Sequence, residues 1–328
     1  MLAIDNPKEF DKKPIKLALD GEGRDVWYVK DQMLPAISTT KDPFDFLTQK
    51  ELFGLKKKYR VGSKIFKQIQ KCYKMKDEHI DLGDDPCIEH KLLIGDIEDM
   101  IIDRMKRTYH GGSELLPYYD TSMTGKIAMH TSIIASSGSG KSYLTAEILF
   151  ANFKESHIYI FSPTASRDPA YVKLQKQLGK RRVKLINSND IDVPLTETMI
   201  AKGSTVVFDD LESTLQPARR FIAALQSRLL YHGRHLQHKT TGAGVTVISV
   251  LHDAFRQRET KAAAIESSRI ILFPQTNRSV STKYLKTRLN FTSQEVKQLD
   301  DFVGKSRWCC LYTHFPLCVI TPTGVMLR

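Results

Sequence analysis

Ala135-Ser136-Ser137-Gly138-Ser139-Gly140-Lys141-Ser142 is the stretch of the sequence that decides the fold. An apolar run over residues 127–134 precedes it and an amphipathic run over residues 141–153 follows it, which predicts a strand, a tight loop and a helix in succession. Gly138 and Gly140 permit backbone angles and a close approach that a side chain would block. The backbone N–H groups of such a loop, together with the positive end of the helix dipole, form a binding site for phosphate groups.

The same stretch fits the Walker A motif of nucleotide-binding proteins, apart from Ala135 at the position of the first glycine. Alanine is the smallest replacement, so we expect an altered start of the loop rather than lost binding. Lys141 places a cation on the outer phosphates, and the hydroxyl of Ser142 can bind Mg²⁺. The alternative interpretation is a chance Gly/Ser turn. We therefore predict ATP and Mg²⁺ as cofactors, with phosphate contacts from Ser136, Ser137, Gly138, Ser139, Gly140, Lys141, Ser142 and Tyr143.

The chain after residue 126 alternates short apolar runs with amphipathic stretches, which is typical of β-α-β units around a parallel sheet. Further strands are predicted over residues 158–161, 183–186, 205–208, 245–251 and 270–273, helices over 221–231 and 293–302, and a C-terminal β-hairpin over 308–320 that turns into 325–327. We predict an α/β fold: a P-loop NTPase of the ASCE/RecA-like kind with a mostly parallel central sheet over residues 123–328. Residues 1–122 are predicted to form a separate N-terminal region of unknown role, with DNA or capsid contact as one hypothesis.

An apolar strand that ends in two carboxylates follows the phosphate loop along the chain. It reads Thr205-Val206-Val207-Phe208-Asp209-Asp210 and lies where a Walker B strand is expected. Asp209 would hold Mg²⁺, and Asp210 would orient and polarise the attacking water as a general base. The alternative is a solvated acidic strand end.

Three more residues are catalytic candidates. His252 follows the apolar run 245–251 and should emerge at the carboxyl edge of the sheet, where ligands of open α/β sheets bind, so it could sense the γ-phosphate or the attacking water. The alternative is a histidine that merely caps the strand. Arg234 and Arg269 are candidate arginine fingers, because a guanidinium at the γ-phosphate spreads the charge of the transition state. Arg269 could instead be a charge at the start of a strand, and Arg234 a DNA contact.

The overall composition is that of a globular protein with an excess of positive charge. The 328 residues are 41% hydrophobic and 26% charged, and the formal net charge of +12 favours a polyanionic partner such as nucleic acid. No apolar run reaches the roughly 20 residues of a membrane helix, and no signal-peptide pattern opens the chain, so we expect neither membrane insertion nor secretion. The five cysteines show no C-x-x-C pair, which indicates buried thiols rather than a disulfide framework or a zinc site.

A lysine stripe in the N-terminal region is the first candidate for DNA contact. The segment 56–76 carries nine Lys or Arg residues and no acid, and four lysines recur at helical spacing, which would place them on one face. Such a face can bind phosphates in a salt-dependent manner, or it can be a solvated surface. The lysines are Lys64, Lys67, Lys71 and Lys74, and the second candidates, around residues 218–234, are Arg219, Arg220, Arg228 and Arg234. No base-reading motif is present, which predicts sequence-independent contact.

Residues 126–275 resemble the FtsK/HerA superfamily of DNA-pumping ATPases, and are most similar to the poxvirus-type packaging ATPases of large DNA viruses, virophages and polinton-like viruses. The discriminating segments are 231–235, with its Gly-Arg-His, and 247–252, where His252 stands at a position that is commonly Gln. The resemblance implies a ring of six or five identical subunits, a finger arginine that acts on the neighbouring subunit's ATP, and double-stranded DNA in the central channel. It also implies a capsid or portal vertex as partner. Residues 1–125 carry no such resemblance.

The leading hypothesis is an ATPase that couples hydrolysis to translocation of double-stranded DNA, for the packaging of a viral genome into a preformed capsid. We expect it in the host cytoplasm or a viral factory, with association to the virion as a further expectation. A cellular or plasmid translocase or helicase of the same superfamily is the alternative. A P-loop kinase of small molecules and a non-catalytic nucleotide switch are alternatives of a different class.

Overall fold

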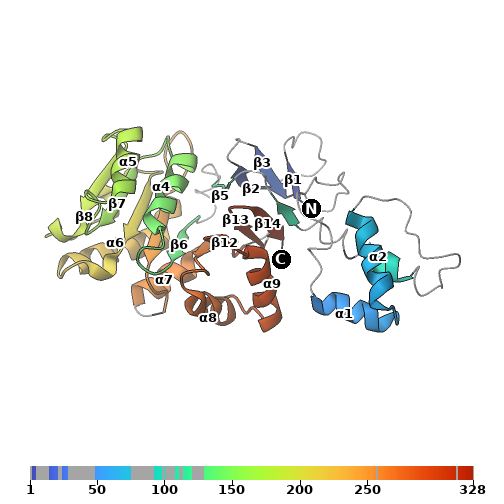
Figure 1. Ribbon diagram of the computed structural model, residues 1–328. Coiled ribbons are helices and arrows are strands. Elements are labelled where there is room, and N and C mark those ends of the chain that lie inside the picture. Colours follow the sequence, from blue (N-terminus) through green and yellow to red (C-terminus); the bar gives the residue numbers. More distant parts are fainter. Residues whose placement is uncertain are drawn as a thin grey trace.

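The computed structural model describes residues 2–4, 15–20, 24–28, 49–74, 92–97, 100, 108–110, 114–119, 129–255, 258–314 and 317–327. Within these residues, ten strands form one large sheet, whose parallel half has the order β11-β6-β10-β9-β7-β8 (Figure 1). These strands are β6 (Thr131–Ile134), β7 (Ile158–Ser162), β8 (Val183–Asn187), β9 (Thr205–Asp209), β10 (Thr246–Leu251) and β11 (Arg269–Leu272). All six are short, and all but the edge strand β8 are buried along their whole length, as expected of strands covered on both faces.

The other half of the sheet is antiparallel. β12 (Cys309–Tyr312) pairs with β11, and β13 (Cys318–Thr321) and β14 (Gly324–Leu327) continue the sheet outward. The predicted C-terminal hairpin is therefore confirmed. The outermost strand is β4 (Thr108–His110), which pairs with β14 although it precedes the phosphate loop in the chain.

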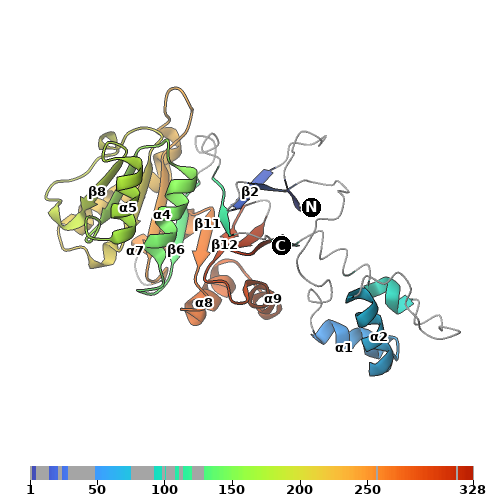
Figure 2. The same cartoon turned by 45° about the horizontal axis from the view of Figure 1, so that its top comes forward.

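Helices cover both faces of the large sheet (Figures 1 and 2). α4 (Lys141–Asn152) and α5 (Pro169–Leu178) lie on one face. The opposite face carries α6 (Ala218–His232), α7 (Arg258–Glu266), α8 (Arg278–Arg288) and α9 (Ser293–Val303). Two buried clusters match these faces: the first contains Ile148, Leu174 and Ile160, and the second contains Ile222, Leu299 and Val206. Short 3-10 turns connect the elements at Ser188–Asp190, Glu197–Met199, Leu211–Ser213 and Gly233–His235.

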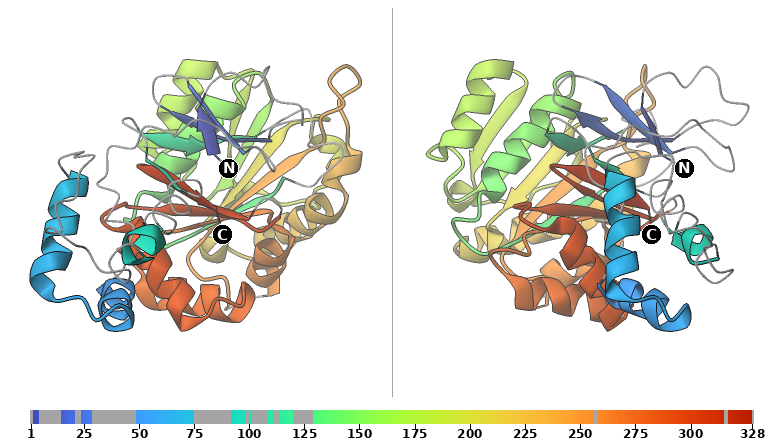
Figure 3. Two further views of the ribbon diagram at one scale, coloured as in Figure 1. Left: turned by 90° about the vertical axis from the view of Figure 1, so that its right-hand side faces the viewer. Right: turned by 45° about the vertical axis from the view of Figure 1, so that its right-hand side comes forward.

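A second, four-stranded antiparallel sheet lies beside the C-terminal strands (Figure 3). Its strands are β1 (Leu2–Ile4), β3 (Asp25–Tyr28), β2 (Ile15–Asp20) and β5 (Leu115–Pro117), in this order. The hydroxyl of Tyr312 donates hydrogen bonds to the carbonyls of Leu17 and Tyr118, which fastens this sheet to β12. The division of the chain at residue 122 stays a prediction, although β4 and β5 join segments from before that point to the rest of the fold.

Helices α1 (Gln49–Lys58) and α2 (Ser63–Lys74) form a small unit beyond the C-terminal strands (Figures 1 and 2). With the helical residues 92–97 they enclose a third buried cluster that contains Leu55, Phe66, Ile69, Leu93 and Ile97. The lysines of α2 lie on its other side: Lys64, Lys67 and Lys71 are exposed, and the side chain of Lys74 lies outside the described part of the chain.

The predicted fold class is confirmed: the chain has an α/β fold with a largely parallel sheet, and β6 is joined to α4 by the phosphate loop. β10 lies between β6 and β9, so the ends of three adjacent strands bring the phosphate loop, Asp209 and His252 to one edge of the sheet. Among the described residues, no helix is long and apolar enough to span a membrane.

Candidate nucleotide-binding site

The phosphate loop has the backbone that its glycines suggest. Gly138 has φ 73° and Gly140 has φ 89°, both in the left-handed region that residues with a Cβ avoid. Gly140 caps α4, whose first residue is Lys141, so the N-terminal N–H groups of the helix open toward the loop. The loop therefore presents the donors and the positive dipole end that phosphate binding requires.

The ammonium of Lys141 lies inside the loop rather than in solvent. It donates to the carbonyl oxygens of Ala135, at 2.7 Å, and Ser136, at 2.8 Å. Burial lowers the pKa of Lys141, while the charges of Asp209, Asp210 and Glu212 act in the opposite direction. Among the described residues, no carboxylate lies within ion-pair distance of this ammonium, so its charge can meet an incoming anion.

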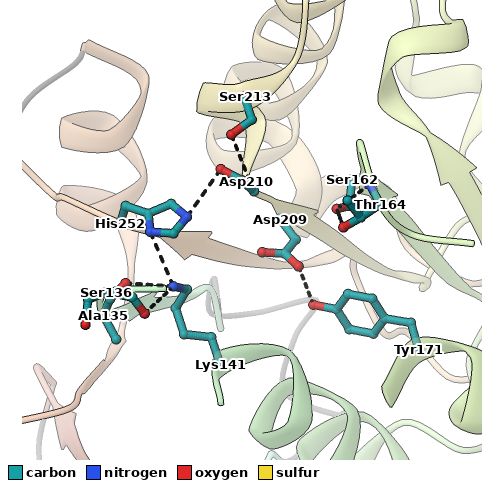
Figure 4. Close-up of polar contacts among 10 residues, drawn as sticks. All are labelled: Ala135, Ser136, Lys141, Ser162, Thr164, Tyr171, Asp209, Asp210, Ser213 and His252. Atoms are coloured by element: carbon teal, nitrogen blue, oxygen red, sulfur yellow. Dashed lines mark hydrogen bonds and ion pairs between the residues drawn. The ribbon is translucent and has the colours of Figure 1, made fainter. Parts of the chain in front are cut away.

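Tyr171, which the sequence analysis did not identify, lies next to Asp209 and Ser142, the two predicted magnesium ligands. The hydroxyl of Tyr171, on α5, donates to Oδ2 of Asp209 at 2.9 Å (Figure 4). The side chain of Ser142 also acts on this phenol and lowers its pKa, against the larger effect of burial. Asp209 is only 6% exposed, and this burial raises its pKa from 3.8 to about 6, against the lowering effect of Tyr171 and Lys141. Oδ1 of Asp209 points away from Tyr171 and is available for a cation (Figure 4).

Asp210 faces the phosphate loop through His252. Nδ1 of His252 lies 3.5 Å from Nζ of Lys141, and Nε2 lies 3.3 Å from Oδ1 of Asp210, so the imidazole stands between the two predicted catalytic groups (Figure 4). Asp210 adopts left-handed backbone angles, φ 52° and ψ 40°, which Asp tolerates better than most residues. Ser213 donates to its other oxygen at 2.8 Å, which fixes the carboxylate.

The donors at this site fit a magnesium ion that arrives with a nucleotide. Among the described residues, no group of three or more His, Cys, Asp or Glu side chains could hold a metal by itself. Mg²⁺ prefers hard oxygen ligands and is commonly bound by one or two carboxylates together with substrate phosphates. The hydroxyl of Ser142 and the carboxylate of Asp209, gathered around one phenol, are such a partial set.

Two further residues at this edge escaped the sequence analysis. Arg307, between α9 and β12, donates from Nε to the carbonyl of Ser139 at 2.8 Å and lies against Gly140. Glu212 follows Asp210; burial raises its pKa, and its Oε1 has no hydrogen-bond partner within the described part of the chain. The acidic run 209–212 could have drawn attention to Glu212, whereas nothing near Arg307 in the sequence connects it to a loop about 170 residues away.

The structure places Arg269, a candidate arginine finger, in a buried position at the start of β11. Arg269 starts β11 and is 4% exposed, and its guanidinium lies over the rings of Tyr119 and Tyr312, at 4.3 and 4.6 Å from their centroids. It also donates to the carbonyl of Tyr118 at 3.2 Å. Because parallel strands begin at the edge opposite to the phosphate loop, this buried cation holds the two sheets together and does not reach the nucleotide site of its own chain.

The remaining arginine candidates divide between the two edges of the sheet. Arg234 is exposed just before β10, at the edge opposite to the phosphate loop, so any role as a finger requires a second subunit's nucleotide. Arg219 and Arg220 lie in the first turn of α6, on the same edge as the site; Arg219 is half-buried and lines a small cavity with Glu212, while Arg220 is exposed. Arg228 is farther along α6, 3.9 Å from Glu197.

No protein-family model and no curated protein sequence matches the chain. Among solved structures, the genome packaging NTPase B204 of Sulfolobus turreted icosahedral virus 2, in complex with ATP-gammaS, is 12% identical over 60% of this chain and 98% of its own, with a TM-score of 0.31. The cytoplasmic domain of the type VII secretion ATPase EccC of Thermomonospora curvata is 14% identical over 66% of this chain and 28% of its own, with a TM-score of 0.40. A DnaB-like replicative helicase is 12% identical over 83% of this chain and 73% of its own, with a TM-score of 0.29. At these values the similarities assign no function.

Proposed function

We propose that this protein binds and hydrolyses ATP and uses the energy to translocate double-stranded DNA. The observation that carries the proposal is the position of His252, which contacts both Lys141 of the phosphate loop and Asp210 of the β9 strand end. Two groups that share one imidazole lie close enough to act on one triphosphate. Had they stood at opposite edges of the sheet, neither assignment would support hydrolysis.

Each residue of this set has a distinct task in the proposed reaction. The loop N–H groups and Lys141 stabilise charge on the phosphate oxygens, which is the main requirement in phosphoryl transfer. Mg²⁺, held by Ser142 and Asp209 when it is bound, would neutralise further phosphate charge. Asp210, fixed by Ser213, accepts a hydrogen bond from the attacking water. His252 couples the positions of Lys141 and Asp210, and so could report whether the outer phosphate is in place.

The DNA part of the proposal rests on charge. The chain has a formal net charge of +12, and α2 presents Lys64, Lys67 and Lys71 on an exposed face whose reverse side is packed. Arg220 adds an exposed cation at the edge of the nucleotide site. The resemblance of residues 126–275 to packaging ATPases extends the proposal to genome packaging, a homo-oligomeric ring of six or five subunits, a capsid or portal partner and work in the host cytoplasm or a viral factory.

The decisive experiment measures phosphate release from ATP with and without linear double-stranded DNA, across a series of salt concentrations. We expect a DNA-stimulated rate that Lys141→Ala abolishes and that Lys176→Ala, a change at an exposed lysine of α5, leaves intact. A normal rate for Lys141→Ala would refute the site. A rate that DNA never stimulates would refute translocation and leave the nucleotide site standing.

The lysine face is tested by a triple change of Lys64, Lys67 and Lys71 to Gln. Each lysine that contacts a phosphate contributes about one unit to the slope of log affinity against log salt, so the slope should become shallower by about three units. The matched control removes the same charge at exposed lysines elsewhere, namely Lys176, Lys180 and Lys297. An equal effect of the two triple variants would mean that only net charge matters. Stimulation of the ATPase by empty capsids would distinguish a packaging motor from a cellular translocase.

A further inference from the structure

The phenol of Tyr171 reaches the metal end of the candidate site from a helix that the Walker motifs do not include. Tyr171 is 0% exposed, its hydroxyl donates to Oδ2 of Asp209 at 2.9 Å, and the side chain of Ser142 acts on the same hydroxyl. Figure 4 shows the ring lying between α5 and the end of β9 with its oxygen at the carboxylate. Both candidate ligands of the cation thus adjoin one side chain that is not itself a ligand.

The surroundings hold this phenol in place. Asp168 caps α5 by accepting a hydrogen bond from the N–H of Ala170 at 2.9 Å, and Pro169 starts the helix, so Tyr171 sits in a rigid first turn. Its ring belongs to the buried cluster that also contains Leu144 and Ile148 of α4. A buried phenol needs a partner for its hydroxyl, and here that partner is the carboxylate.

We propose that Tyr171 is a positioning residue for the magnesium site: its hydroxyl engages Oδ2 of Asp209 and thereby turns Oδ1 toward the cation that Ser142 also faces. This inference rests on the proposed function, since it names a supporting residue of the same site. Groups that hydrogen-bond a metal ligand fix its orientation, and their loss typically lowers metal affinity by about 10- to 100-fold. A tyrosine that only filled the core would leave metal affinity unchanged.

The test compares Tyr171→Phe with a matched loss of one buried hydroxyl. Tyr284 is also buried, and its hydroxyl donates to the carbonyl of Ala264 on the other face of the sheet, so Tyr284→Phe is the control. Binding of a fluorescent, non-hydrolysable ATP analogue is titrated against Mg²⁺, and separately measured in EDTA. Thermal unfolding of both variants reports whether the fold is kept.

For Tyr171→Phe we expect the Mg²⁺ concentration for half-maximal binding to rise about tenfold or more, with affinity for the analogue in EDTA unchanged. Tyr284→Phe should behave as the wild type in both assays. An unchanged Mg²⁺ requirement in Tyr171→Phe would overturn the inference, as would an equal loss of affinity in EDTA. Failure of the wild type to bind the analogue at all would instead refute the proposed function.

The Asp209→Asn background tests whether the effect passes through the carboxylate. There Tyr171→Phe should cause no further rise in the Mg²⁺ requirement, and a further tenfold rise would overturn the inference. Tyr171→Phe alone leaves the buried carboxylate of Asp209 without its hydrogen-bond donor, which can prevent folding. The double variant has an uncharged asparagine there, so it can be compared with Asp209→Asn alone even if Tyr171→Phe does not fold.

Discussion

Replacing Asp209 by asparagine removes an ionisable group from a strand end that is only 6% exposed. Burial raises the pKa of Asp209 from 3.8 to about 6, so the ionised form costs stability in the folded chain. The rise corresponds to about 3 kcal/mol, at 1.36 kcal/mol for each pKa unit. We expect Asp209→Asn to increase the free energy of unfolding by about this amount at pH 8, because asparagine can still accept the hydrogen bond from Tyr171.

The sign of this effect follows from proton binding. A folded-state pKa above the unfolded value means that the folded protein binds the proton more tightly, so the contribution of Asp209 to stability is full below pH 3.8 and is lost as the pH rises to about 6. The advantage of the Asn variant should therefore be small at pH 4, about half its final size at pH 5, and constant above pH 7.

Urea unfolding in EDTA, without nucleotide, measures this difference at each pH. Other groups titrate in both proteins, so subtracting the wild-type curve isolates Asp209. Asp192→Asn, at an exposed position, is the control and should show no such pH-dependent gain. An Asn variant no more stable than the wild type at pH 8, or a gain as large at pH 4 as at pH 8, would refute the reasoning.

Three further substitutions test the phosphate loop and two buried side chains of the surrounding fold. Gly140→Ala places a Cβ at φ 89°, which costs about 1–2 kcal/mol, and we expect nucleotide affinity in a fluorescence titration to fall about tenfold. His130 is fully buried, and burial lowers its pKa from 6.5 to about 4, so its contribution to stability should fall by about 3 kcal/mol as the pH falls through this window; subtracting the urea-unfolding curve of His130→Gln from that of the wild type separates this fall from the opposite effect of Asp209. Arg269→Met should lower the free energy of unfolding by about 2 kcal/mol through its lost ring contacts, yet leave the ATPase rate of the folded protein within about twofold.

The sequence predicts the phosphate loop and the strand ends of the site well, because each depends on residues that are adjacent in the chain. A strand, a glycine loop and a helix are adjacent in the chain, and the alternation of apolar runs places Asp209 and His252 at strand ends. The relation among these ends also follows from the parallel sheet, in which carboxyl ends share an edge. The same rule places Arg269 at the opposite edge, because that arginine is the first residue of its strand.

Tyr171 and Arg307 were missed for a different reason. Tyr171 reaches the Asp209 carboxylate, and Arg307 reaches the phosphate loop, only because separate elements pack against the sheet. These contacts depend on tertiary structure, so no residue spacing in the sequence predicts them. The signal for Tyr171 is weak but real: Asp168-Pro169 predicts a helix start soon after β7, which places the first turn of that helix at the carboxyl edge of the sheet.

The distribution of charge within the site explains why these additional contacts matter. Asp209, Asp210 and Glu212 gather at one edge opposite the ammonium of Lys141. Among the described residues, that ammonium bonds carbonyls of its own loop and is connected to Asp210 through His252. An ion pair between Lys141 and Asp209 would relieve the cost of burial but would occupy the place that a phosphate and its cation need. Tyr171 holds Asp209 on one side and the loop carbonyls hold Lys141 on the other, so the fold keeps opposite charges apart at a cost in stability. A nucleotide–magnesium complex carries both signs of charge, so its binding offsets the free energy that this separation costs. The folded state is therefore stabilised when the complex binds, although the site also forms without it.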